Sequence, residues 1–175
     1  MAVTEWFIPA SDSRAERLGA VLGIENPALA RVLASFGLDA TCAPLVAWIP
    51  AIEFAWRRSP TGDDRQRILA LVFARHGLLA TRAEILLYEW LARRPPAALF
   101  STARRVLRAQ LAMLPPDQRP ALCAGVIAPC VQLAERSRGL LGLGPVSDDQ
   151  QRWLRVLAED LLFPNEQPDP RESLS

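Results

Sequence analysis

The sequence predicts an all-α protein, a single-domain bundle of about seven to eight helices. Apolar residues recur at helical spacing along most of the chain, whereas no extended alternation of Val, Ile and Thr and no Asn-Gly or Asp-Gly turn indicates a strand. Half of the residues are apolar and 22% are charged, as in an ordinary globular core. The length of 175 residues suits one domain.

Residues 1–42 are expected to form an N-terminal helical extension with two helices. The polar residues 11–13 cap the first helix, over residues 13–22, and its apolar side chains are expected on one face. Asn26-Pro27 begins the second helix, and Gly37 ends it. The apolar residues of the first helix are Leu18, Val21 and Leu22.

Residues 43–163 are expected to form the main domain, followed by a disordered tail over the polar, proline-rich residues 164–175. Its first segment, 43–57, is apolar almost all round, which predicts a central helix buried on most sides. Pro50 removes one backbone hydrogen bond inside this helix, so a kink is expected there. Five further helices begin at Asp63-Asp64, at a Thr81–Glu84 capping box, after Pro95-Pro96, after Pro115-Pro116 and at a Ser147–Gln150 capping box.

Two parts of the main domain resemble each other. Residues 49–55 match residues 128–134, with proline at the same point, and residues 63–69 match residues 148–154. The connection within the second pair is six residues longer, and the extra length falls in residues 138–144. The matches predict two pseudo-repeated helical hairpins that share one core, and chance similarity between Ala-, Leu- and Arg-rich helices is the alternative.

Over residues 43–162 the chain resembles the TerB-like family, named for tellurite-resistance proteins. It is most similar to a bacterial branch of that family whose function is not established. The strings that carry the resemblance are Trp90 to Pro96, Leu140 to Gly144 and Val146-Ser147. The resemblance implies an all-α domain built from duplicated helical hairpins.

Acidic residues of the TerB-like hairpin are associated with metal binding, and this chain departs from that pattern. Arg58-Ser59 stands where the family has Asp-Gly, and Arg65 and Gln150 stand where it has Glu. The second Asp-Gly position falls in residues 138–144, which contain no acid. Hard cations need several oxygen ligands, and a guanidinium group never deprotonates, so the metal site is not expected here.

Four aspartates are the metal ligands of the alternative interpretation, in which metal binding persists. Acids in the first turn of a helix are also favoured by the helix dipole, which explains them without a metal. Adjacent helical residues point about 100° apart, so neither pair could clamp an ion alone. These residues are Asp63, Asp64, Asp148 and Asp149.

Several chemistries are excluded or disfavoured by residue type. All 20 basic residues are arginine, which excludes a P-loop lysine and a Schiff-base lysine, and no Gly-rich phosphate loop is present. His76, the only histidine, precedes Gly77 and is expected near a helix C-terminus. Cys42, Cys123 and Cys130 are expected to be buried thiols. The basic run Arg93, Arg94, Arg104, Arg105 and Arg108 is expected to be a solvated face, and the aromatic residues 48, 54, 56, 73, 90 and 153 are expected in the core.

The expected function is that of a non-enzymatic, cytoplasmic accessory module that binds another protein, without a cofactor. The net charge of +1 and the absence of a long apolar run give no reason to expect nucleic-acid or membrane binding. The alternative is a divalent-metal-binding or tellurite- or stress-response protein of the TerB-like type. An enzyme that uses Glu53, His76 or Glu84 in a helical pocket is a third hypothesis.

Three leucines in the longer connection are the partner-binding candidates. Loops seldom carry large apolar residues, so these side chains are expected either to fill the core or to contact a partner. Glycines at 139, 142 and 144 permit a tight backbone path that aims them in one direction. The leucines are Leu140, Leu141 and Leu143.

Overall fold

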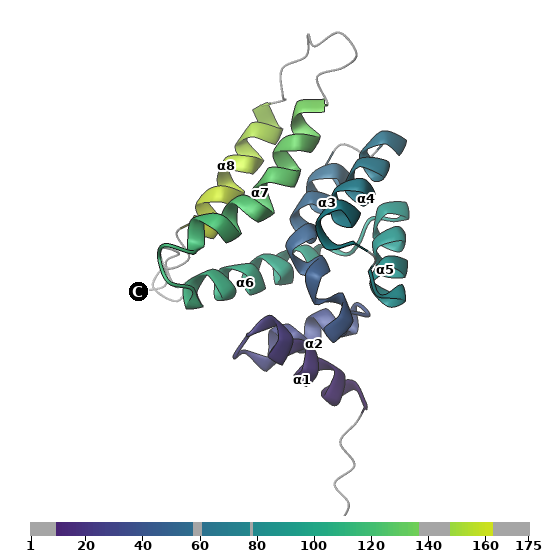
Figure 1. Ribbon diagram of the computed structural model, residues 1–175, viewed down its shortest axis with the longest axis vertical. Helices are drawn as coiled ribbons and strands as arrows, with labels where there is room; N and C mark the ends of the chain where they lie inside the picture. Colours follow the sequence, from purple (N-terminus) through teal and green to yellow (C-terminus); the bar gives the residue numbers. More distant parts are fainter. Residues whose placement is uncertain (1–9, 58–60, 78, 137–147, 163–175) are drawn as a thin grey trace, which may run out of the picture.

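The computed structural model describes residues 10–57, 61–77, 79–136 and 148–162, and all regular secondary structure within them is helical, as predicted. The described residues form eight α-helices and one 3-10 helix, which surround one core (Figure 1). In chain order they are α1 (Ala10–Leu22), α2 (Pro27–Ser35), the 3-10 helix η1 (Ala40–Trp48), α3 (Ile49–Trp56), α4 (Gly62–His76), α5 (Thr81–Ala92), α6 (Ala97–Met113), α7 (Arg119–Arg136) and α8 (Asp148–Leu162).

Helix α2 begins and ends close to its predicted position, whereas α1 begins at Ala10, so the predicted capping role of residues 11–13 is wrong because these residues are already helical. The Asn26 side chain caps α2 by accepting a hydrogen bond of 3.0 Å from the Ala28 N–H, and Gly37 follows with a positive φ of 92°. Leu18 and Leu22 are buried, whereas Val21 is exposed.

The predicted helix over residues 43–57 is two helices, and the predicted kink is instead a break before Pro50. Pro50 has no N–H to donate to the Val46 carbonyl, four residues earlier. The Ile49 N–H instead donates a hydrogen bond to the Val46 carbonyl, and this bond closes η1 in the tighter 3-10 pattern. Pro50 then lies in the first turn of α3, where a missing N–H costs nothing. The prediction of a central buried helix is confirmed for α3, in which all residues but Glu53 and Trp56 are buried.

Of the helices α4 and α5, only α4 begins with a capping box. Thr61 and Asp64 form a reciprocal capping box at the start of α4. The box predicted for Thr81 and Glu84 is wrong, because Ala80 is the N-cap of α5 and makes no side-chain cap. The box predicted at Ser147 and the tail 164–175 lie outside the described residues.

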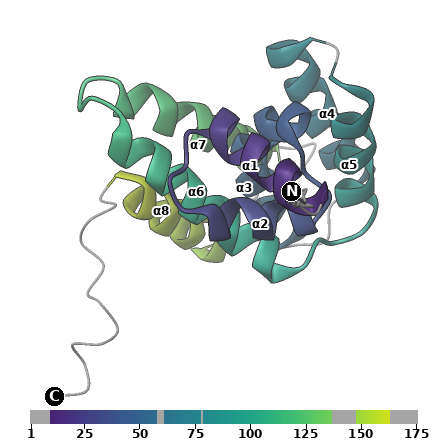
Figure 2. The ribbon, with the colours of Figure 1, turned by 90° about the horizontal axis from the view of Figure 1, so that it is seen from below.

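The helices are arranged around α3. Helix α7 packs against both α3 and α8, α6 contacts α2, α3 and α8, and α5 packs on η1 (Figure 1). Figure 2 shows α1 and α2 across one end of the bundle, with α4 and α5 to one side and α6, α7 and α8 to the other. Buried residues of α1 and α2 belong to the same hydrophobic cluster as those of α3 to α8.

No single helix among those described is long and apolar enough to cross a membrane. Residues Pro27–Ser35 and Ala40–Trp56 pass the same test of length and composition only as a pair, with a bend of 90° between them.

The prolines of the two matched segments, 49–55 and 128–134, occupy different helix positions. Pro50 is in the first turn of α3, whereas Pro129 lies inside α7. Pro129 cannot donate to the Gly125 carbonyl, and Nη1 of Arg75 in α4 donates to it instead, at 3.0 Å. Gly125 leaves room for this guanidinium, because a Cβ there would lie 2.8 Å from Arg75 Nη2. Arg75 therefore joins α4 to α7 at the carbonyl that Pro129 leaves unpaired.

The interaction of Arg75 with Gly125 is expected to depend on Pro129. Arg75→Met should lower the free energy of unfolding by about 1 kcal/mol, because the carbonyl loses its donor. In a Pro129→Ala background the same change should cost much less, because the alanine restores a backbone N–H that can serve the carbonyl. Urea denaturation of the four proteins measures this cycle. If Arg75→Met costs the same in both backgrounds, Arg75 does not replace the N–H that is missing at Pro129.

Candidate functional site

Two ion pairs join α6 to its neighbours in the middle of the bundle. Nη1 of Arg104 donates to both carboxylate oxygens of Glu53 on α3, at 2.9 and 2.7 Å. The Glu53 side chain is 12% exposed and that of Arg104 is 28% exposed. One turn further along α6, Nη1 of Arg108 donates to Asp160 of α8 at 3.0 Å. Charged side chains thus bridge three helices where they are partly shielded from water.

These contacts correct the prediction for the basic run 93–108. Arg93, Arg94 and Arg105 are exposed, as expected for a solvated face. Arg104 and Arg108 instead turn toward α3 and α8 and are half-buried. Their acidic partners lie about fifty residues away in the chain, so no local pattern marks them.

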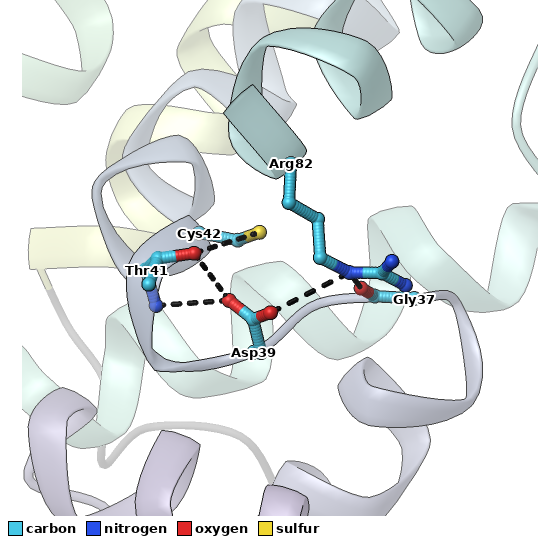
Figure 3. A network of polar contacts seen from close by, with 5 residues as sticks. All are labelled: Gly37, Asp39, Thr41, Cys42 and Arg82. Atoms are coloured by element: carbon cyan, nitrogen blue, oxygen red, sulfur yellow. Dashed lines mark hydrogen bonds and ion pairs between the residues drawn. The ribbon is translucent and has the colours of Figure 1, made fainter. Parts of the chain in front are cut away.

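A second polar cluster lies where α2 connects to η1 (Figure 3). The Asp39 carboxylate caps η1 by accepting hydrogen bonds from the Thr41 N–H at 2.9 Å and from the Thr41 hydroxyl at 2.5 Å. Nε of Arg82 in α5 donates to the Gly37 carbonyl at 2.8 Å and lies 3.5 Å from the Asp39 carboxylate. Cys42 completes the cluster, with its sulfur 3.9 Å from the Thr41 hydroxyl. The cluster ties the α2–η1 connection to the first turn of α5.

The electrostatics of this cluster favour a carboxylate and disfavour a thiolate. Burial alone would raise the pKa of Asp39, but hydrogen bonds from Thr41 and Cys42 and the charge of Arg82 hold that pKa below its ordinary value. Burial raises the pKa of the Cys42 thiol. Since the thiolate is the nucleophilic form of cysteine, Cys42 is a poor nucleophile in this position.

The other two cysteines are buried free thiols as well, as predicted. Burial raises the pKa of both Cys123 and Cys130, and the negative charge of Glu53 adds to the effect at Cys130. The Cys130 thiol donates to the Val126 carbonyl of its own helix at 3.6 Å. Both residues therefore behave as small apolar side chains of α7.

His76 has a specific partner that the sequence did not indicate. The buried Trp48 indole N–H donates to Nε2 of His76 at 2.9 Å, and the two rings meet edge to face. Helix α4 ends at His76 and Gly77 follows as its C-cap, which confirms the predicted place of the histidine. Burial and the neighbouring charge of Arg75 lower the pKa of His76 below its ordinary value of 6.5. Neutral His76 thus links the end of α4 to η1.

This hydrogen bond is expected to make stability depend on pH in a particular direction. Protonated His76 cannot accept from Trp48, and its folded pKa is lowered, so the folded state binds fewer protons than the unfolded state. The contribution should be complete above pH 6.5 and should be lost as the pH falls below it, through the folded pKa. His76→Gln should change stability at pH 7.5 by no more than about 1 kcal/mol and should reduce the fall in melting temperature toward pH 5.5. An identical pH profile for both proteins would show that His76 does not contribute.

The four aspartates of the alternative metal interpretation lie at the starts of α4 and α8 and have other partners or face solvent. Asp64 accepts from the Thr61 N–H and hydroxyl, both at 2.9 Å. Asp149 pairs with Arg57 at 3.0 Å. The other two, Asp63 and Asp148, are exposed first-turn residues. Within the described parts of the chain, no group of three or more His, Cys, Asp or Glu residues could hold a metal ion.

Divalent cations are therefore expected to leave the melting temperature unchanged. A cation at a hundred times its dissociation constant would stabilise the folded state by about 2.7 kcal/mol, which is several degrees for a domain of this size. Thermal denaturation with and without Ca²⁺, Mg²⁺ or Zn²⁺ measures this. A rise that a chelator reverses would contradict the expectation, and loss of that rise in Asp64→Asn and Asp149→Asn would assign it to these carboxylates.

The remaining candidates from the sequence are placed as follows. Glu53, His76 and Glu84 lie on three different helices, and no hydrogen bond or ion pair within the described residues joins any two of them. The aromatic residues at 48, 54, 90 and 153 are buried in the core as predicted, and those at 56 and 73 are partly buried. The partner-binding candidates Leu140, Leu141 and Leu143 lie outside the described residues.

A groove of about 490 Å³ lies between α1 and α2. Its floor is formed by small residues at a close approach of the helices, where a Cβ on Gly19 would lie 3.3 Å from the Cβ of Ala30. The exposed side chains of Glu16, Glu25 and Arg31 surround it. No sequence pattern indicated this groove.

The outer face of α5 is the surface feature that the sequence analysis missed. Ile85 and Tyr88 are 53% and 48% exposed and lie three residues apart on one side of the helix. In the part of the chain that the structure describes, no other helix exposes two large apolar side chains on a shared face. Helix α5 has more apolar residues than the single stripe that packs against neighbouring helices, and this excess is the signal in the sequence.

No protein-family model matches the chain, and no curated protein or solved structure is significantly similar to it. The resemblance to the TerB-like family stays a prediction that rests on the strings quoted above.

Proposed function

We propose that this chain is a non-enzymatic protein-interaction module whose binding face is the outer side of α5. The observation that carries the proposal is the exposed pair Ile85 and Tyr88 on that face. Single exposed apolar residues are normal on any protein, but neighbouring ones on an ordered helix are typical of an interaction site. An amphipathic helix that presents apolar residues three or four positions apart is a recurrent mode of protein recognition.

Helix α5 is held firmly from its inner side, which supports its use as a binding element. Its residues Ala83, Leu86, Leu87, Trp90 and Leu91 are buried in the core. The Trp56 indole N–H donates to the Trp90 carbonyl at 2.8 Å, which satisfies a carbonyl in the last turn of α5. Arg82 ties the first turn to Gly37. A rigid helix loses little conformational entropy on binding.

Arginine side chains act as cross-links between helices, which suits a scaffold. Among the described residues, three arginines donate to backbone carbonyls and four pair with carboxylates, and Arg82 does both. The guanidinium group suits both tasks, because its planar fork offers five donors. The carbonyl donors are Arg75, Arg82 and Arg119, and the arginines paired with carboxylates are Arg57, Arg82, Arg104 and Arg108.

The proposal is tested with a photo-crosslinking amino acid at position 92, which is exposed on the same face and leaves Ile85 and Tyr88 intact. Adducts formed in the native host are identified, and each captured protein is then produced alone for an affinity measurement. The double variant Ile85→Glu/Tyr88→Glu should bind at least about tenfold more weakly, since it removes an apolar centre of the interface.

Val156→Glu is the matched control, because Val156 is as exposed as Ile85 but lies on α8. It adds one of the same charges at a distant surface and should bind like the native chain. The proposal fails if position 92 captures no protein, or if the α5 variant and the control bind equally well.

A further inference from the structure

The charged residues of the α5 outer face are placed to match a second copy of the same face. Arg82 and Glu89 lie seven residues apart, which is two turns or about 10.5 Å along the helix. At 100° per residue both lie to one side of Ile85, and Tyr88 lies to the other. Arg82, Ile85, Tyr88 and Glu89 are all exposed.

This spacing favours one relative orientation of two copies. In an antiparallel pair related by a two-fold axis near Ile85, Arg82 of each helix lies opposite Glu89 of the other, and the Ile85 side chains meet at the centre. In a parallel pair the two-fold axis runs along the helices, so Arg82 and Glu89 of one copy lie across from the Tyr88 side of the other, and no Arg–Glu pair forms. A two-fold interface needs a self-complementary patch, and the antiparallel arrangement makes this face self-complementary.

Arg82 is both positioned and available for such a contact. Its Nε donates to the Gly37 carbonyl at 2.8 Å and lies 3.5 Å from the Asp39 carboxylate, which holds the side chain in place (Figure 3). The side chain is nevertheless about half exposed. Its two Nη groups carry four further N–H donors that can reach a carboxylate of a partner.

We propose that this chain forms an antiparallel two-fold homodimer through the outer face of α5. The inference rests on the proposed function, since it names the partner of the same face. Helix α5 has 12 residues, so the contact is smaller than the roughly 800 Å² per partner of a standard stable interface. The dimer is therefore a reversible one, with a dissociation constant on the order of 10–100 µM.

Sedimentation equilibrium of the purified chain between about 5 and 500 µM tests the dimer, because this range brackets the expected dissociation constant. The native chain should pass from monomer to dimer across it. Glu89→Arg should weaken the dimer at least about tenfold, because the new guanidinium group would lie opposite Arg82 of the other copy. Arg82→Glu should do the same, and an equal mixture of the two single variants should dimerise again through Arg–Glu pairs.

Disulfide trapping tests the same register and leaves Arg82, with its contact to Gly37, unchanged. Ile85→Cys should form a disulfide-linked dimer under mild oxidation, because the two positions meet at the axis. Val156→Cys is the control of equal exposure and should link at least about tenfold more slowly. The native cysteines are buried and do not compete.

A monomer throughout the concentration range overturns the homodimer, as does unchanged dimerisation of Glu89→Arg or equal linking of the two cysteine variants. If the chain is monomeric but position 92 captures a different protein that Ile85→Glu/Tyr88→Glu no longer binds, the homodimer fails and the proposed function stands. If that double variant also retains every partner, both proposals fail.

Discussion

Phe54→Ala is expected to lower the free energy of unfolding by about 3–5 kcal/mol, since it removes a large aromatic side chain from the centre of the core. Phe54 is fully buried in α3, and its ring centroid lies 5.5 Å from that of Trp153 in α8. The substitution leaves a cavity between α3 and α8. For a domain of this size the melting temperature should fall by roughly 6–20 °C, as followed by circular dichroism at 222 nm.

Two control variants separate the loss of packing from other effects. Phe54→Leu refills most of the volume and should cost less than half as much as Phe54→Ala. Ile85→Ala removes an apolar side chain from the exposed face of α5 and should change stability by no more than about 0.5 kcal/mol. A Phe54→Ala protein as stable as Ile85→Ala would mean that α3 is not the centre of the core.

Arg104→Met is expected to lower the free energy of unfolding by about 2 kcal/mol, because it leaves the Glu53 carboxylate shielded and without its partner. Breaking a fully buried pair costs roughly 3–5 kcal/mol, and the cost is smaller here because Arg104 keeps contact with water. Arg105→Met, one residue away and exposed, should be nearly neutral.

The pairing itself is measured by a double-mutant cycle with Glu53→Gln. Since the two side chains contact each other directly, the double variant should be at least about 1 kcal/mol more stable than the sum of the single effects predicts. Urea denaturation of the four proteins gives the coupling. Additive effects would show that Glu53 and Arg104 contribute separately.

Helix starts and ends were predictable wherever a local contact defines them. The Asn26 cap, the acids at the start of α4 and Gly77 after His76 act within four residues of the chain, and the structure confirms the helix end that each one marks. The local signal failed at the start of α5. At residue 81 the backbone is already helical at the threonine, so its hydroxyl cannot act as the N-cap.

Partners between helices were not predictable from the same patterns. The Trp48–His76, Arg75–Gly125 and Glu53–Arg104 contacts span 28, 50 and 51 residues. In the sequence, Arg104 and Arg105 look alike, yet one bridges to α3 and the other faces water. Neighbouring residues of a helix point 100° apart, so one of the two arginines can face α3 while the other faces water. Which one faces α3 can be known only from the position of α3.

By itself, the sequence determined that the chain is helical, where most helices begin and end, and which residue types are available for chemistry. Those properties follow from backbone hydrogen bonds, caps and apolar spacing within a few residues. Only the tertiary structure decided that Pro129 is accommodated within a helix, and that Ile85 and Tyr88 stay uncovered. The physical reason is that a donor from α4 replaces the N–H missing at Pro129, and that burial of a helix face depends on which other helices pack against it.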